Sequence, residues 1–253
     1  MSAVVALGPF AFPSRDAYKN DWTVFFRPAT LAILHGDSPY QVQGFHNPPW
    51  LLIPLVPLAL LPAAIGNFLI GQAYVASFFV VSRKFGAPRW LSIALVCSPF
   101  VLVGVLMGQM DWLPALGLLM PPWLGILFLL AKPQVGVGVV VFWLIQAWAD
   151  GWRALTRTLG PAAILCAVSF VLYGFWPPAM FKAVGYFWNA SLWPWSIPAG
   201  AGFLVWSIRR NRIGGAIIAG PLLSPYVSPI SWVLPLMLGS IWAVSRRPDF
   251  KPA

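Results

Sequence analysis

Residues 108–134 read GQMDWLPALGLLMPPWLGILFLLAKPQ, and this pattern sets the architecture expected for the rest of the chain. The stretch between Asp111 and Lys132 is apolar and is interrupted by the pair Pro121-Pro122. Two consecutive prolines can end one helix and begin the next, because proline lacks an N–H and restricts the residue before it. We therefore predict a hairpin of two short helices. Asp111 and Lys132 then lie at its open ends, where an ion pair between them would tie the hairpin together.

The composition indicates a membrane protein. Of the 253 residues, 59% are hydrophobic and only 9% are charged, whereas soluble domains carry about 25% charged residues. So few charges exclude the soluble globular, disordered, coiled-coil and disulfide-rich secreted classes. A spanning helix needs roughly 20 apolar residues, so we expect an all-α polytopic bundle of about eight to ten membrane segments. We expect residues 1–253 to form one integral membrane domain, with the transmembrane bundle over 48–245.

The basic residues indicate which loops face the cytoplasm. They gather in short clusters between apolar runs, a pattern typical of cytoplasmic loops. The clusters are Arg83, Lys84 and Arg89; Arg153 and Arg157; Arg209, Arg210 and Arg212; and Arg246, Arg247 and Lys251. The apolar runs from residue 90 onward are 90–107, 111–131, 133–149, 158–175, 197–208, 213–224 and 230–245. With the clusters inside, the outer loops are 108–111, 132–134, 176–196 and 224–229.

Residues 14–47 are the only long polar stretch, and they hold half of the six acids and both histidines. Functional residues concentrate on loops, so we expect an outer loop here with a functional role. The following segment, 48–82, fits two passes hinged near residues 62–67. If the loop is outside and the cluster at Arg83 is inside, however, the number of passes is odd. One of the two pieces is then juxtamembrane or re-entrant.

Neither the cysteines nor the net charge indicates a cofactor or a nucleic acid. Cys97 and Cys166 lie singly within apolar runs, so we expect no disulfide and no cysteine metal site. No His/Asp cluster has the spacing of metal ligands, so we expect no metal. The formal charge of +10 comes from the loop clusters, so we expect no nucleic-acid partner.

Polar motifs occur in a fixed order along the chain. They are DWTVFFRPATLAILHGDSPY at 21–40, GFHNPPW at 44–50, GQMDW at 108–112, KPQ at 132–134 and SPYVSPISW at 224–232. Taken together, from Asp21 to Trp232, this order resembles glycosyltransferase family 87. That family belongs to the GT-C superfamily of polytopic transferases and includes mannosyltransferases that use polyprenyl-phosphate mannose. The resemblance implies a GT-C-like fold in a bacterial inner membrane, with the active site on the extracytoplasmic face.

The resemblance also implies a reaction. A mannose-like hexose would pass from a polyprenyl-phosphate sugar to a lipid or glycan acceptor, with inversion and without a cofactor. Asp21 matches the Asp that acts as general base on the acceptor hydroxyl, a role that suits a positioned carboxylate. The departing lipid phosphate needs cations nearby. The candidates for that role are Arg15, Arg27, His46 and Lys132. Gln109, Asp111 and Gln134 are candidates for binding sugar hydroxyls, and Tyr40, Asn47, Ser228 and Trp232 complete the expected substrate-binding set.

Two departures from the family pattern favour a different class of function. Only 13 apolar residues begin the chain, where family members have a spanning helix before the Asp, and the turn between GQ and KPQ is reduced to Pro121-Pro122. A non-catalytic membrane subunit or scaffold derived from the family is therefore the alternative. Asp21, beside Asn20, is also placed to cap a helix. The aromatic residues of 176–196 fit either an interfacial belt or a wall that stacks on a lipid or a sugar ring.

Overall fold

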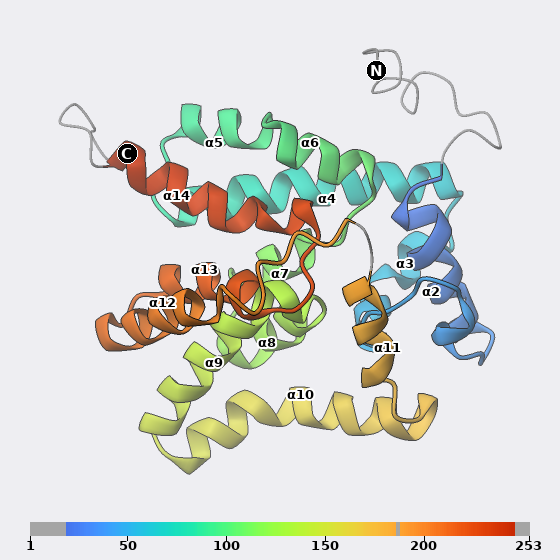
Figure 1. Ribbon diagram of the computed structural model, residues 1–253. Coiled ribbons are helices and arrows are strands. Elements are labelled where there is room, and N and C mark those ends of the chain that lie inside the picture. The colour runs from blue at the N-terminus through green and yellow to red at the C-terminus, as the bar shows by residue number, and fades with distance from the viewer. Residues whose placement is uncertain (1–18, 186–187, 246–253) are drawn as a thin grey trace.

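The computed structural model describes residues 19–185 and 188–245, and every regular element in these ranges is a helix (Figure 1). Arg15 and the cluster at Arg246 lie outside the described residues. The elements are η1 Trp22–Phe26, α2 Arg27–Leu34, η2 Pro39–Gln41, η3 Pro49–Leu55, α3 Val56–Ala59, α4 Ala63–Lys84, α5 Arg89–Val96, α6 Pro99–Leu106, α7 Trp112–Gly117, α8 Pro122–Leu130, α9 Pro133–Ala149, α10 Trp152–Tyr173, α11 Pro177–Phe181, η4 Lys182–Gly185, α12 Ile197–Arg210, α13 Ile213–Leu223, η5 Pro229–Trp232 and α14 Val233–Ser245. The all-helical expectation is confirmed.

Helices α4 and α10, with 22 residues each, are long and apolar enough to cross a membrane. Helices α5 and α6 meet at a bend of 48° and make a third span if the bent pair counts as one. Other apolar helices have 10–17 residues. At 1.5 Å per residue, they do not cover a hydrocarbon layer of about 30 Å. A bundle of eight to ten membrane segments therefore stays a prediction.

The predicted hairpin is present. Helix α7 ends at Gly117 and α8 begins at Pro122. The two helices touch where a Cβ atom on Gly117 would lie 2.9 Å from the carbonyl oxygen of Gly125, so only glycine allows this approach. Lys84 Nζ donates a hydrogen bond of 2.6 Å to the carbonyl of Leu118, which fixes the turn of the hairpin against the end of α4.

The run expected at 90–107 is broken into two helices. Helix α5 ends at Val96, and α6 begins at Pro99. Proline cannot continue a helix from the preceding turn, because it lacks the N–H and its ring clashes with the carbonyl four residues back. Within α6, Gly104 lies directly against the ring of Tyr74 on α4, so a side chain at this position would overlap the tyrosine.

The N-terminal region corrects the expectation of a continuous loop over 14–47. Residues 22–34 form the helical turns of η1 and α2, because WTVFF and TLAIL supply an apolar helical sequence inside the polar stretch. Residues 49–59 form a short helix that contacts α2 and lies across the end of α4 (Figure 1). Of the two pieces of 48–82, only α4 is long enough to span a membrane. This agrees with the case of an odd number of passes, in which the other piece is juxtamembrane or re-entrant.

Helices α9, α12 and α13 pack side by side (Figure 1). Helix α9 has the bounds predicted for it, 133–149. A Cβ atom on Gly138 would run into the carbonyl oxygen of Ala216, and one on Gly220 into that of Val135. These glycines therefore let the backbones of α9 and α13 approach closely, as small residues do between membrane helices.

We expect Gly138→Ala to destabilise the protein, because the added methyl group meets backbone atoms that cannot move aside. Overpacking of this kind costs about 1–3 kcal/mol. The matched control is Gly160→Ala in α10, where an added Cβ meets nothing within 4 Å. Thermal unfolding in detergent micelles should show a lower Tm for Gly138→Ala only. Equal Tm values for the two variants would contradict the close crossing.

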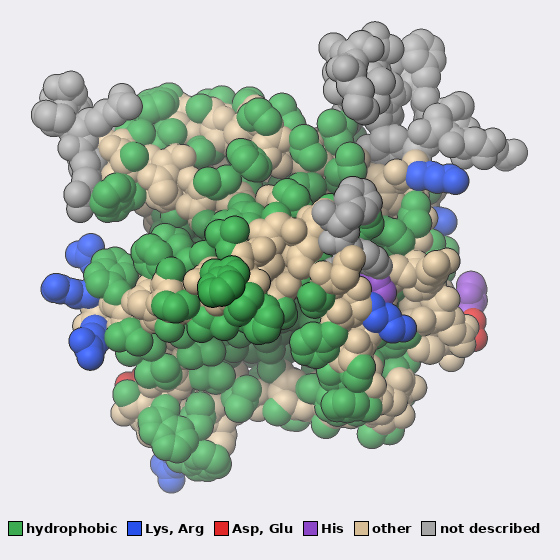
Figure 2. Space-filling view, in the orientation of Figure 1, with side chains coloured by type: hydrophobic (Ala, Val, Ile, Leu, Met, Phe, Trp, Pro, Cys, Tyr) green, Lys and Arg blue, Asp and Glu red, His purple; other side chains and the backbone are tan. Residues whose placement is uncertain are grey.

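Charged side chains gather at both ends of the molecule, and the acidic and His side chains seen at the right of Figure 2 accompany Lys and Arg there. Figure 2 shows apolar side chains over most of the visible face, and Lys and Arg side chains at the left, where α12 meets α13. Arg83 and Lys84 lie in the last turn of α4, and Arg209 and Arg210 in the last turn of α12. The opposite end of α4 begins at Ala63, next to the helices of residues 22–59. We call this the polar end.

Candidate functional site

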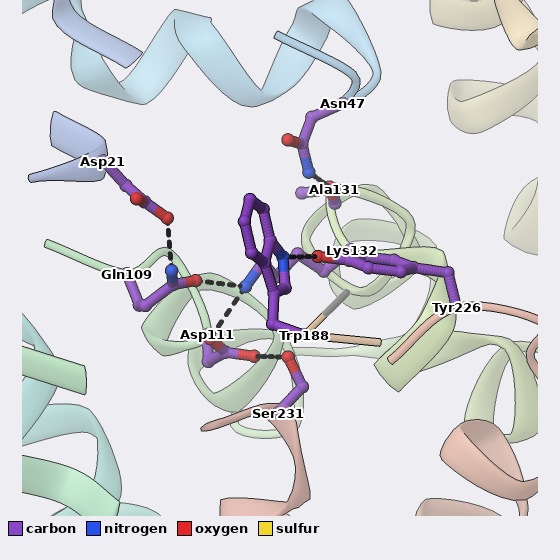
Figure 3. A network of polar contacts seen from close by, with 9 residues as sticks. All are labelled: Asp21, Asn47, Gln109, Asp111, Ala131, Lys132, Trp188, Tyr226 and Ser231. Carbon is purple, nitrogen blue, oxygen red and sulfur yellow. Dashed lines mark hydrogen bonds and ion pairs between the residues drawn. The ribbon is translucent and has the colours of Figure 1, made fainter. Parts of the chain in front are cut away.

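Five polar side chains from distant parts of the chain meet in one hydrogen-bonded network at the polar end (Figure 3). Asp21 directly precedes η1, and Gln109 and Asp111 precede α7. Lys132 lies between α8 and α9, and Ser231 lies in η5. We call these five residues the polar network. Each of the five residues lies in or next to the end of a helical element, so the packing of that element fixes the position of its backbone.

Lys132 is the centre of the network. Its Nζ donates to Oδ2 of Asp111 at 2.8 Å and to Oε1 of Gln109 at 2.8 Å. The other carboxylate oxygen of Asp111 accepts a bond of 2.8 Å from Ser231 Oγ. Asp111 is 0% exposed and Lys132 is 4% exposed, and charges so deeply buried require such partners. The ends of the hairpin therefore meet as predicted, and Asp111 holds Lys132 in position.

Gln109 connects the buried ion pair to Asp21. Its Oε1 accepts from Lys132, and its Nε2 donates to Oδ2 of Asp21. The ammonium group can only donate and the carboxylate can only accept, so the amide has one orientation that satisfies both neighbours. Asp21 is partly exposed, whereas the other four members are buried. The network thus runs from a closed interior to one accessible carboxylate.

A capping motif fixes Asp21 on the backbone. Thr23 N donates to Asn20 Oδ1 at 3.0 Å, and Asn20 N donates to Thr23 Oγ1 at 3.0 Å. The backbone N–H of Asp21 donates to the carbonyl of Met107 at 3.0 Å, and Asn20 Nδ2 donates to Asn67 Oδ1 on α4 at 2.7 Å. The Asp21 side chain makes no capping bond. Asn20, not Asp21, therefore caps this helix, and the Asn-x-x-Thr spacing was the signal for it.

The surroundings of Asp21 make it a suitable base at neutral pH. Burial raises the pKa of its carboxyl group from 3.8 to about 6. The positive charge of Lys132 and the bond from Gln109 oppose this rise in pKa, and the negative charge of Asp111 adds to it. A general base works best when its pKa lies near the working pH. At pH 7 Asp21 is therefore mostly ionised and still basic enough to accept a proton.

Tyr40 and Asn47 lie next to the network but outside it. Asn47 Nδ2 donates to the carbonyl of Ala131 at 3.2 Å, one residue before Lys132. Tyr40 Oη donates to the carbonyl of Asn47 at 3.0 Å, and its ring stacks on Trp176 with an interplanar angle of 7°. Both side chains thus attach residues 40–47 to the link between α8 and α9.

Arg27 and His46 are separate from the network as well. Arg27 Nη2 donates to the carbonyl of Leu61 at 3.4 Å, which directs the guanidinium towards the start of α4. His46 is partly buried, and both this burial and the charge of Lys182 lower the pKa of its imidazole. His46 is therefore mostly uncharged near pH 7, and Lys182 supplies the positive charge beside it.

The remaining predicted residues have mainly structural contacts. The carbonyl of Ser228 accepts from Ser231 N at 2.9 Å, and Trp232 Nε1 donates to the carbonyl of Ala190 at 3.4 Å. Gln134 is partly buried in the first turn of α9. Within the described contacts, none of these three side chains joins the network. Ser231, three residues after the predicted Ser228, joins the network instead.

Trp188 and Tyr226, which the sequence had not singled out as a pair, lie beside the network. Trp188 Nε1 donates to Tyr226 Oη at 3.4 Å. In Figure 3 the indole stands between the Asp21 side of the site and Tyr226.

An apolar groove of about 190 Å³ lies between α4, α6 and α14. Its lining includes Phe78, Phe100, Val101 and Met237, together with Val233, two residues after Ser231. The apolar lining suits a hydrocarbon chain.

Across residues 19–185 and 188–245, no group of three or more His, Cys, Asp or Glu side chains is arranged to hold a metal ion. The side chains of the polar network supply a carboxylate, an amide, a buried ion pair and a hydroxyl. Comparisons with protein-family models, with curated proteins and with solved structures found no match to this chain.

Proposed function

We propose that this chain is a membrane-embedded inverting glycosyltransferase of the GT-C kind. It moves a mannose-like hexose from a polyprenyl-phosphate sugar to a lipid or glycan acceptor. One observation carries the proposal: Asp21, a partly exposed carboxylate, ends a network that joins it through Gln109 to Lys132. Residues 88 and 23 positions apart along the chain converge there, and a helix cap alone does not require such convergence.

In the proposed reaction, Asp21 accepts the proton of the acceptor hydroxyl while the hydroxyl oxygen attacks the anomeric carbon. The bond between that carbon and the phosphate oxygen breaks, and the polyprenyl phosphate leaves as an anion. Gln109 keeps the carboxylate oriented by donating to one of its oxygens. The second carboxylate oxygen then faces the acceptor, as general-base catalysis requires.

The leaving phosphate needs positive charge and hydrogen-bond donors. Two of the three N–H bonds of Lys132 are directed at Asp111 and Gln109, and Asp111 offsets its charge. Lys182 lies within electrostatic range of His46 at the same end, and Asn47, next to His46, donates to the carbonyl of Ala131. We therefore propose that Lys182 supplies more of the positive charge than Lys132 does, with the neutral imidazole of His46 as a hydrogen-bond donor.

The proposal includes a placement in the membrane. The short helices would combine with α4, α10 and the bent pair α5 and α6 into about eight to ten membrane segments. The basic clusters would face the cytoplasm, so the polar end and Asp21 would face outward from a bacterial inner membrane. The polyprenyl chain would enter from the lipid side, and the apolar groove offers a surface for it.

One observation favours the alternative of a non-catalytic membrane subunit. The pair Asp111–Lys132 uses both carboxylate oxygens and is closed to solvent, which is the geometry of a structural tie. A scaffold needs this tie, but it does not need a partly exposed Asp21.

The test is a transfer assay on the protein in lipid nanodiscs. Radiolabelled polyprenyl-phosphate hexoses serve as donors, and a membrane lipid extract supplies acceptors. We expect label to appear in a new lipid or glycan product. Asp37→Asn, which changes an exposed carboxylate in the same region, should transfer at the wild-type rate. Absence of transfer from every donor would favour the subunit.

We expect the transfer rate to depend on pH with a midpoint near 6. Asp21 must be ionised to accept a proton, and the pKa of its carboxyl is raised to about 6. Activity should therefore fall as the pH decreases through 6 and should be level between pH 7 and 8. The measurement is kcat/KM for the acceptor from pH 4.5 to 8. A midpoint near 4, the ordinary range of an exposed carboxyl, would contradict the buried base.

A further inference from the structure

Trp188 presents a large aromatic side chain beside the polar network. The indole is 44% exposed, yet its Nε1 donates to a protein hydroxyl, Tyr226 Oη, at 3.4 Å. Trp195 lies on the same connection and is 89% exposed. An interfacial belt tryptophan usually leaves its polar edge to water and lipid headgroups. Trp188 instead donates from its polar edge to the protein, while the residue as a whole is 44% exposed.

Hydrogen bonds of Asn189 and Ala190 hold the backbone that follows Trp188. Asn189 Nδ2 donates to the carbonyls of Val184 at 3.1 Å and Pro225 at 3.0 Å. Asn189 Oδ1 accepts from Val227 N at 3.1 Å, and Ala190 N donates to the carbonyl of Val227 at 2.8 Å. Residues 189–191, Asn-Ala-Ser, thus connect the segment that follows Trp188 to residues 225–227 by hydrogen bonds. These bonds restrict where the adjacent indole can lie.

The pair lies close enough to the network to share its substrate. The phenol of Tyr226 lies within electrostatic range of both Asp21 and Asp111. Burial raises the pKa of this phenol, the bond from Trp188 opposes the rise, and the two carboxylates add to it. Tyr226 is therefore neutral, and its hydroxyl can accept from the indole. In Figure 3 the indole lies between Asp21 and Tyr226, with Asn47 above it.

We infer that Trp188 is the platform on which the pyranose ring of the donor sugar stacks, and that Tyr226 positions it. This inference rests on the proposed function. A hexopyranose has one face of C–H groups and a rim of hydroxyl groups. Aromatic faces attract the C–H face, whereas carboxylates and amides bind the rim. Trp188 beside Asp21 and Gln109 combines both kinds of surface, so Trp188 determines whether the site accepts a hexose.

The experiment measures binding without transfer. Protein in nanodiscs is titrated with radiolabelled polyprenyl-phosphate mannose and, separately, with polyprenyl phosphate that lacks the sugar, and no acceptor is present. The ratio of the two Kd values reports the contribution of the sugar. We expect Trp188→Ala to reduce this ratio by about 10-fold, Trp188→Phe by about 2–3-fold, and Tyr226→Phe by an intermediate factor. Trp195→Ala is the matched control and should leave the ratio unchanged.

Binding of polyprenyl phosphate reports whether each variant is folded, because that ligand does not need the platform. An unchanged ratio in Trp188→Ala overturns the inference, and so does an equal reduction in Trp195→Ala, which would indicate a belt. A wild-type protein that binds both lipids equally also overturns it, even if transfer occurs. Conversely, a ratio that depends on Trp188 without any transfer supports the platform and contradicts the proposed catalysis.

Discussion

If Asp21 is the base of the proposed reaction, Asp21→Asn should reduce glycosyl transfer by about 10³-fold, within the 10²–10⁴-fold that a general base contributes. Asparagine has nearly the same shape, and its amide oxygen can still accept the bond from Gln109 Nε2. The neutral amide cannot take a proton from the acceptor hydroxyl, so the chemical step is slowed while the fold is retained. The measurement is kcat from single-turnover transfer in nanodiscs, with Tm recorded for the same preparations.

Asp37→Asn provides the comparison for this variant, because it removes a carboxylate that is exposed and outside the network. It should keep the wild-type kcat and the wild-type Tm. If Asp21→Asn retained more than about a tenth of the wild-type kcat, far above the loss expected of a general base, another group would have to be the base. In that case the network would serve stability only.

The second large effect is on stability. Lys132→Met removes the only ammonium group bonded to Asp111 among the described contacts, and Asp111 is 0% exposed. Breaking a buried pair on one side costs about 3–5 kcal/mol, because an uncompensated charge stays in the interior. We expect the free energy of unfolding in mixed micelles to fall by this amount. Lys182→Met, at an exposed lysine, should leave it unchanged.

The double variant Lys132→Met with Asp111→Asn distinguishes a charge effect from a packing effect. Removing both charges leaves no unpaired ion, so the double variant should lose less than the sum of the two single losses. Ser231 can still donate to the amide oxygen of the new asparagine. Additive losses would mean that the side chains contribute through packing alone. This result applies whether the protein is an enzyme or a subunit.

Much of the helical pattern could be predicted from local sequence. Pro121-Pro122 and the runs at 133–149 and 213–224 each contain their own start or stop signals, and these helices are where they were expected. Pro99 is the same kind of signal, but it lies inside the continuous apolar run 90–107. The hydrophobicity of that run favoured one unbroken segment. Residues 22–34 were hidden for the opposite reason, because polar neighbours on both sides made an apolar helix resemble a loop.

The candidate site was predictable only in part. Asp111 and Lys132 flank one hairpin, so a local pattern was enough to bring them together. Asp21 and Gln109 were both named as site residues from the resemblance to a family, but no local rule predicts a contact between residues 88 positions apart. Ser231 and Tyr226 could not be selected from their motif. Which member of SPYVSPISW faces the network depends on the turn of η5 and on how α14 packs.

The span of the polar network also has a consequence for biosynthesis. Asp111 has two partners that leave the ribosome at different times. Lys132 follows Asp111 by 21 residues, and Ser231, which bonds to the second carboxylate oxygen, follows it by 120 residues. Domains and their parts form as the chain emerges, at about 5–20 residues per second. The ion pair can therefore close seconds before the serine arrives, so a nascent chain passes through a stage in which the hairpin is tied but the site is incomplete. Membrane chaperones and proteases would meet that intermediate first, and substitutions in η5 should show their effect there, as reduced yield of inserted protein.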